Sequence, residues 1–97
     1  MKISSVGANQ TEVTLTNGDI ILISYQSPMA IITNTKPKTA QIAKWYWDND
    51  NKAMCDVTKT TKKHIASFLA RYGVTKAGEC LSTELQTRID NDSQSAK

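Results

Sequence analysis

The sequence predicts an α+β domain in which an antiparallel meander of three to four strands packs against one main helix in the C-terminal half, with a short second helix after it. Three observations support this prediction. An Asn17-Gly18 pair lies between two β-rich runs, an apolar stripe at helical spacing follows within residues 61–72, and the strand-like segments precede the helical ones. With 97 residues, the chain is long enough for one domain.

The first predicted element is a β-hairpin formed by residues 11–16 and 19–25. Asn-Gly between two such runs is typical of a type I′ turn, because both central residues of that turn need a positive φ. A two-residue loop pairs Leu15 with Ile20, and the register continues from there. We therefore expect one face of the hairpin to be core, formed by Val13, Leu15, Ile20 and Leu22.

Further strands are expected in the middle of the chain. Residues 29–33 form the third strand, and the basic loop 34–39 follows without an apolar residue. Three consecutive aromatic residues favour a fourth strand over residues 43–47, although the sequence of residues 40–44 also suits a helical turn. Two weaker segments complete the set, a short strand or arm around Ile3 and Val6 and a short strand over residues 54–57.

The main helix is predicted over residues 61–72. Its apolar stripe follows the spacing i, i+3, i+4 and i+7 and consists of Ile65, Phe68, Leu69 and Tyr72. The hydroxyl that caps its start is expected from one of three threonines, Thr58, Thr60 or Thr61. Gly73 followed by the apolar Val74 fits a Schellman motif at its end.

A second, shorter helix is predicted over residues 83–90, where Thr83 and Gln86 fit a capping box. Residues 91–97 are polar and are expected to form a disordered tail, so the predicted domain spans residues 1–90. The order of strands followed by helices favours a two-layer arrangement.

Composition excludes several classes of protein. Hydrophobic residues are 39% of the chain, yet no run approaches the ~20 apolar residues that cross a bilayer. The N-terminus lacks the apolar core of a secretory signal, so we expect a cytoplasmic protein without membrane contact. Cys55 and Cys80 are expected to be free thiols rather than a disulfide, and His64 is expected at the surface or its boundary.

No catalytic or metal-binding motif is present in the sequence. The chain has neither a phosphate-binding glycine loop nor a nucleophile elbow, and its two cysteines and one histidine fall short of a four-ligand zinc site. We therefore expect no enzymatic activity, no metal and no cofactor.

The first candidate surface is an aromatic and charged segment. In a strand, Trp45 and Trp47 share one face and Tyr46 takes the other, so a two-layer domain leaves one of these faces partly exposed. Aromatic residues beside charges are typical of protein-binding hot spots, and the alternative is that both Trp side chains pack under the helix. The predicted partner-binding residues are Lys44, Trp45, Tyr46, Trp47, Asp48, Asp50 and Lys52.

The second candidate surface is basic. Residues 36–76 contain nine basic and three acidic residues, a net charge of +6. Lysines on a helix beside exposed aromatics can bind phosphates while the aromatics stack on bases, and the alternative is an ordinary solvated helix face. The predicted nucleic-acid-binding residues are Lys59, Lys62, Lys63 and Arg71.

Two motifs carry a resemblance to a known group of proteins. They are the hairpin whose second strand ends in Ser24-Tyr25 and the helix start Thr60-Thr61-Lys62-Lys63-His64-Ile65. Together, over residues 11–72, they resemble a family of short uncharacterised proteins encoded by bacteriophages. The segment 34–55 departs from that family in its length, charge and aromatic content, and no functional residue is carried over from the family.

The resemblance implies a small phage or prophage accessory protein that acts by binding. We expect a non-enzymatic inhibitor of a host defence complex, such as a CRISPR effector, that occludes a nucleic-acid site. The alternative is a nucleic-acid-binding protein that uses the basic helix. A homodimer that covers the second apolar face of the sheet is a further alternative, unless the C-terminal helix or residues 40–57 cover it.

Overall fold

The computed structural model of the chain describes the backbone of residues 1–48 and 53–95, and the side chains of residues 1–44 and 56–93. The fold is α+β, which confirms the predicted class. A six-stranded mixed sheet forms its centre, made of β1 (Lys2–Gly7), β2 (Gln10–Thr14), β3 (Ile20–Ser24), β4 (Ser27–Ile32), β5 (Ala40–Ala43) and β8 (Gly78–Cys80).

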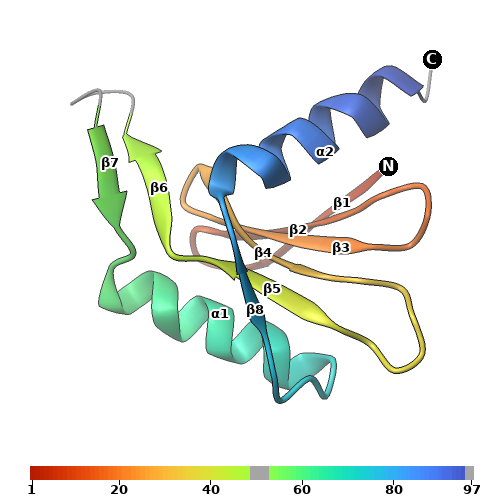
Figure 1. The fold of residues 1–97 in the computed structure, drawn as a ribbon, viewed down its shortest axis with the longest axis horizontal. Coiled ribbons are helices and arrows are strands. Elements are labelled where there is room, and N and C mark those ends of the chain that lie inside the picture. Colours follow the sequence, from red (N-terminus) through yellow and green to blue (C-terminus); the bar gives the residue numbers. More distant parts are fainter. Residues whose placement is uncertain (49–52, 96–97) are drawn as a thin grey trace.

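The first five of these strands form an antiparallel meander, and β8 pairs with β5 in parallel at the far edge. Helix α1 (Lys59–Arg71) and helix α2 (Ser82–Ser95) lie on opposite faces of the sheet (Figure 1). Strands β6 (Trp45–Asp48) and β7 (Ala53–Asp56) form a separate two-stranded sheet at one end of the molecule (Figure 1). The segment predicted as one strand over 43–47 is therefore divided at Lys44 between two sheets.

The β2–β3 hairpin is present, but its predicted register is wrong by one residue. Thr14 pairs with Ile20, and Val13 pairs with Ile21. Because side chains alternate between the faces of a strand, a shift by one residue exchanges those faces. The four residues predicted to share one core face are accordingly divided between the two sides of the sheet.

The loop of this hairpin explains the shift. The backbone N–H of Leu15 donates to the carbonyl of Asp19 at 2.8 Å, and the N–H of Gly18 donates to the carbonyl of Leu15 at 2.9 Å. Gly18 has a φ of 94°, whereas Asn17 does not have the positive φ that a type I′ turn requires. The loop therefore has three residues with glycine in the left-handed position, one residue more than predicted.

Each face of the sheet has its own apolar core. The cluster beneath α1 contains Leu22, Met29, Ala30, Ile32, Ile65 and Phe68. The cluster beneath α2 contains Val13, Leu15, Ile21, Ile31, Leu85 and Ile89. The structure therefore has three layers, helix, sheet and helix, and the predicted two-layer arrangement is wrong. Helix α2 covers the second apolar face of the sheet, which a second copy of the chain was the alternative to cover.

Helix α1 matches its prediction closely. Thr58 is its N-cap. At its end, the N–H of Gly73 donates to the carbonyl of Ala70 at 3.2 Å, and the N–H of Val74 donates to the carbonyl of Leu69 at 3.0 Å. These two hydrogen bonds are the predicted Schellman motif.

Helix α2 is longer than predicted at both ends. The N–H groups of Glu84 and Leu85 both donate to the carbonyl of Leu81, so Thr83 lies inside the helix and the predicted capping box is wrong. The helix continues through residues 91–95, which were expected to belong to the tail. There the Asp92 carboxylate accepts a hydrogen bond from the N–H of Thr16 at 3.1 Å. No helix in the described part of the chain has both the length and the apolar character needed to cross a bilayer.

Candidate functional site

The start of helix α1 carries a group of lysines. Lys59, Lys62 and Lys63 all lie within its first five residues, and all three are exposed. The Thr58 hydroxyl accepts a hydrogen bond from the N–H of Thr61 at 3.2 Å and so caps the helix. The first turn contains no acidic residue. Positive charge therefore gathers at the helix end where the macrodipole is itself positive, which is unfavourable without an anion nearby.

The arginines have a different environment. Arg71 binds the buried carboxylate of Glu12, and Arg88 binds the buried carboxylate of Asp19. In contrast, the three lysines of α1 form no ion pair within the described residues. The chain thus neutralises its guanidinium groups internally and leaves these ammonium groups to solvent or to a partner.

The contacts of Arg71 separate it from the predicted basic site. Its Nε and terminal nitrogen donate to one Glu12 oxygen at 3.0 and 2.6 Å, and the Tyr72 hydroxyl donates to the other oxygen. Burial, together with the hydrogen bond to the Glu12 carboxylate and its charge, raises the pKa of Tyr72 to about 12. Arg71 therefore fastens the end of α1 to β2, and only the three lysines remain grouped at the start of the helix.

Lys62 also borders a residue of the other predicted site. A hollow of about 300 Å³ is lined by both Lys62 and Lys44, together with the carboxylate residues Asp56 and Glu79. The charges around this hollow are mixed. We therefore place the uncompensated positive charge on the outer side of α1 rather than here.

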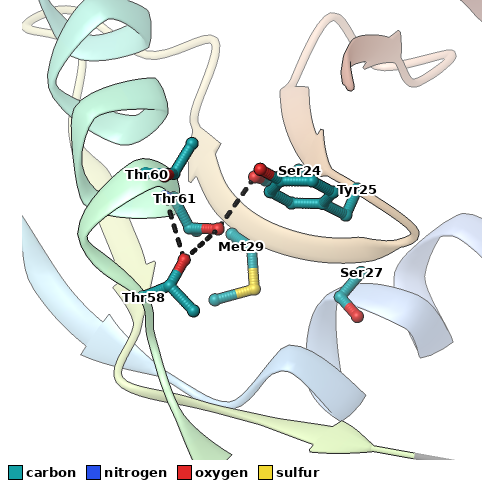
Figure 2. Close-up of a pocket in the computed structure, with 7 residues that line it drawn as sticks. All are labelled: Ser24, Tyr25, Ser27, Met29, Thr58, Thr60 and Thr61. Atoms are coloured by element: carbon teal, nitrogen blue, oxygen red, sulfur yellow. Dashed lines mark hydrogen bonds between the residues drawn. The ribbon is translucent and has the colours of Figure 1, made fainter. Parts of the chain in front are cut away.

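A second hollow, of about 350 Å³, lies between the β3–β4 turn and the first turn of α1. Figure 2 shows the residues of the helix on one side, the residues of the turn on the other, and Met29 between them. Its lining residues are Ser24, Tyr25, Ser27, Met29, Thr58, Thr60 and Thr61. The lining is therefore rich in hydroxyl groups around an apolar centre.

A hydrogen-bond network joins the two sides of this hollow. The Ser24 hydroxyl lies 3.0 Å from the Thr61 hydroxyl and 2.8 Å from Nδ1 of His64. The Thr61 hydroxyl also accepts a hydrogen bond from the Thr58 hydroxyl at 3.3 Å. These contacts fix the end of β3 to the start of α1, so the shape of the hollow is held by both elements.

A serine bonded to a histidine is also the pairing that nucleophilic enzymes use. Here the Ser24 residue is only 2% exposed and shares its hydroxyl with Thr61. No carboxylate among the described residues is hydrogen-bonded to His64 to orient its ring. We therefore interpret the pair as a positioning network for the helix.

Tyr25 stands at the rim of the hollow in an unusual conformation. Its φ is 58°, a left-handed value that costs a residue with a Cβ about 1–2 kcal/mol. The N–H of Tyr25 donates to the carbonyl of Asn9 at 2.7 Å, and its ring centroid lies 5.9 Å from that of His64. The residue is nevertheless 53% exposed. The turn thus holds a large aromatic ring in a strained position with much of its surface open to solvent.

The predicted partner-binding segment is only partly described. Lys44 is exposed at the break between β5 and β6. Strand β6 consists of Trp45, Tyr46, Trp47 and Asp48, of which the structure describes the backbone but not the side chains. Asp50 and Lys52 also lie outside the described residues.

Sequence reasoning missed the hollow. In the sequence, Ser24 and Tyr25 are recognised only as the end of a strand and Thr61 only as part of a helix start. His64 is recognised only as a residue at the surface or its boundary. The Ser24–His64 contact joins positions 40 residues apart, so no local spacing could reveal it. Cys80 is confirmed as a free thiol, whereas the side chain of Cys55 lies outside the described residues. Burial, followed by the nearby charge of Glu84, raises the pKa of Cys80 to about 11.

These features define a small α+β domain with one helix on each face of a mixed sheet and a lysine-rich start to the first helix. The chain belongs to a family of unknown function (DUF8033), whose model matches residues 1–84. The matched region includes the whole sheet and helix α1 and ends within the first turn of α2. No curated protein and no solved structure matches the chain.

Proposed function

We propose that this protein acts by binding nucleic acid along the exposed side of helix α1. The observation that carries the proposal is the contrast in charge pairing. Both arginines are bound to buried carboxylates, whereas Lys59, Lys62 and Lys63 form no ion pair within the described residues. Lysines that are free to meet phosphates supply the electrostatic part of nucleic-acid affinity.

The arrangement of these lysines favours a partner over an ordinary solvated face. Lys59 is one turn away from both Lys62 and Lys63, at the spacings where like charges on a helix repel. The helix macrodipole adds to this cost. A polyanion along the helix would relieve both effects, so the cluster that weakens the free protein would strengthen the complex.

The distribution of charge over the two helices supports the same side of the molecule. Helix α1 carries four basic residues and no acidic one. Helix α2 carries Arg88 against Glu84, Asp90 and Asp92, and Arg88 is already paired. Because the helices lie on opposite faces of the sheet (Figure 1), a polyanion is expected to approach with α1 toward it.

Fluorescence anisotropy with labelled single- and double-stranded DNA and RNA tests this proposal. Three lysine–phosphate contacts predict a log–log salt slope of about −2 for single strands, or about a 20-fold loss of affinity between ~50 and ~200 mM salt. No binding at low salt, or binding that does not change with salt, would exclude α1 as the binding surface.

A second candidate function is inhibition of a host defence complex by a phage-encoded protein. The observation that favours it is the small β6–β7 sheet, which is not hydrogen-bonded to the main sheet and contains the Trp45-Tyr46-Trp47 sequence (Figure 1). Such a hairpin is suited to insert aromatic anchors into a protein partner.

Affinity capture from a bacterial lysate tests this second candidate. The expected result is a stable complex with the wild type that is lost with Trp45→Ala and kept with the control Lys2→Ala. Equal capture by all three proteins would exclude the hairpin, and RNA-guided and restriction complexes are the first captured proteins to examine.

A further inference from the structure

We infer that the hollow between the β3–β4 turn and α1 receives one unstacked nucleobase of a single-stranded nucleic acid. This inference rests on the proposed nucleic-acid binding and names the form of nucleic acid that the site selects. The hollow measures about 350 Å³, at the lower end of the range of about 300–1,000 Å³ that small-molecule sites occupy. That volume suits a single planar ring system rather than a larger ligand.

Tyr25 supplies the stacking surface. The turn and the hydrogen bond of its N–H to Asn9 hold its backbone, and its exposed ring lies at the rim of the hollow in contact with the ring of His64. Stacking on aromatic side chains is how proteins hold single-stranded bases, and it tolerates every base. A ring that already packs against another ring loses less conformational freedom when a base stacks on it.

The interior of the hollow offers both apolar contact and hydrogen bonds. Met29 is a buried residue of its lining between the helix side and the turn side, and its thioether supplies an apolar surface for a flat ring (Figure 2). The hydroxyls of Ser27 and Thr60 form no hydrogen bond within the described residues, whereas Ser24, Thr58 and Thr61 bond to one another or to His64. Ser27 and Thr60 therefore remain available to the polar edge of a base.

The lysines lie where the phosphates of the same strand would run. In the sequence, Lys59 stands between the lining residues Thr58 and Thr60, and Lys63 follows Thr60 by three positions, so it lies about one helical turn further on. A strand whose base enters the hollow would thus continue along the exposed side of α1. A duplex cannot offer an unstacked base at this point without paying the energy of unpairing.

The test compares two fluorescent single strands with equal numbers of phosphates, an ordinary oligonucleotide and one whose central residues are abasic. The wild type is expected to bind the ordinary strand about 5- to 150-fold more tightly, since stacking on one aromatic ring contributes an effect of this size. Lys63→Gln is expected to lower the affinity for both strands by the same factor.

Two variants of Tyr25 complete the test. Tyr25→Ala retains a Cβ at the left-handed position and is expected to bind the ordinary and abasic strands equally. Tyr25→Phe retains the ring and is expected to keep the preference for the ordinary strand. Circular dichroism of each variant establishes that it is folded. Thr60→Val replaces a hydroxyl by a methyl group at an exposed position, and this second variant is expected to have a weaker preference for the ordinary strand.

The outcomes separate this inference from the function on which it rests. A preference for bases that disappears with Tyr25→Ala supports a nucleobase site. Salt-dependent binding that is equal for both strands, and unchanged in Tyr25→Ala, would overturn the nucleobase site while leaving nucleic-acid binding by α1 in place. Failure to bind either strand at low salt would overturn both.

Discussion

Gly18 and Gly73 both have a positive φ, but their surroundings differ. A Cβ added at Gly18 would lie 2.4 Å from Nδ2 of Asn34, whereas a Cβ added at Gly73 would have nothing within 4 Å. We expect Gly73→Ala to lower the free energy of unfolding by about 1 kcal/mol, the cost of its left-handed conformation. Gly18→Ala should cost more, because Asn34 must also move. Urea denaturation measures both values, and equal losses would contradict this reading of the hairpin loop.

Tyr72 makes the stability of the protein depend on alkaline pH. Its pKa of about 12 in the folded state lies above its ordinary value of 10.0, so the folded state retains a proton that the unfolded state loses. Stability from this group is therefore complete below pH 10 and is lost as the pH rises from 10 to 12. Thermal melting in steps of pH measures this loss.

Tyr72→Phe is the variant that isolates this effect, because it keeps the ring and removes the titrating hydroxyl. Cys80 has a folded pKa of about 11 against an ordinary 9.0, so its own contribution falls between pH 9 and 11 in both proteins. The expected result is a shallower decline in Tyr72→Phe above pH 10. Identical profiles for the two proteins would contradict a pKa of Tyr72 that burial and the Glu12 carboxylate raise in the folded state.

Residues with local signals could be predicted from the sequence, and residues in long-range contacts could not. The Thr58 cap and the Gly73–Val74 ending depend on neighbours within one helical turn, and both are confirmed. The Ser24–His64 contact and the strained Tyr25 depend on how β3 meets α1 in space. The hollow could therefore be recognised only from the three-dimensional structure.

At the scale of elements, the hairpin shows how a correct element can have the wrong register. The Asn17-Gly18 pair is compatible with both a two-residue and a three-residue hairpin loop, because each loop places glycine in a left-handed conformation. Asp19 favours the longer loop, because its carboxylate accepts hydrogen bonds from the N–H of Asn34 at 2.7 Å and from Arg88. Burial alone would raise the pKa of Asp19, but these bonds outweigh it and hold the pKa below its ordinary value. Partners from the loop that follows β4 and from α2 thus determine the register.

Two other elements had weak sequence signals. Strand β8 contains only Gly78, Glu79 and Cys80, and it is a strand because β5 lies beside it in parallel. Helix α2 extends to Ser95 through a polar sequence that carries little apolar periodicity, and the contact of Asp92 with Thr16 accompanies this extension. In both cases tertiary contacts outweigh a weak local preference.

Lys59, Lys62 and Lys63 at the start of helix α1 are expected to affect stability and binding in opposite directions. Lys59→Glu places a carboxylate in the first turn, next to the positive end of the dipole, and creates a Glu–Lys pair with Lys63 at the spacing i, i+4. We expect the free energy of unfolding to rise by about 1 kcal/mol, and Tm by about 4–8 °C. Affinity for nucleic acid should fall at the same time.

Lys2→Glu is the matched control, since it makes the same charge change on strand β1, outside the helix. It should not raise Tm and should weaken binding less than Lys59→Glu. Calorimetry and anisotropy on the same samples measure the two quantities. A lower Tm in Lys59→Glu would contradict the unfavourable placement of the lysines.

For the whole molecule, the order of strands followed by helices along the chain predicted the class of fold but not the number of its layers. Strand β3 is apolar on both faces, which indicates that both faces are covered, yet the sequence alone left a second copy, residues 40–57 or the C-terminal helix as the cover. The structure places α2 there, with Leu85 and Ile89 on the cluster around Ile21 and Ile31. The choice depended on the path of the chain from α1 through β8, which the sequence does not indicate.

The placement of one helix on each face also separates charge. Helices α1 and α2 lie on opposite faces of the sheet (Figure 1). Helix α1 carries the lysines that form no ion pair within the described residues, and α2 carries mostly carboxylates. Such a separation orients a small protein as it approaches a polyanion and raises the association rate at low salt. The side of the sheet that carries α1 is therefore the proposed binding surface for nucleic acid.

The most direct test of this claim is the salt dependence of binding to a labelled single strand in two double variants with the same change in net charge. Lys62→Gln with Lys63→Gln should reduce the magnitude of the log–log salt slope by about 1.4, since each lost phosphate contact removes about 0.7. Lys2→Gln with Lys36→Gln should leave the slope close to that of the wild type. Equal slopes in the two double variants would contradict binding through helix α1.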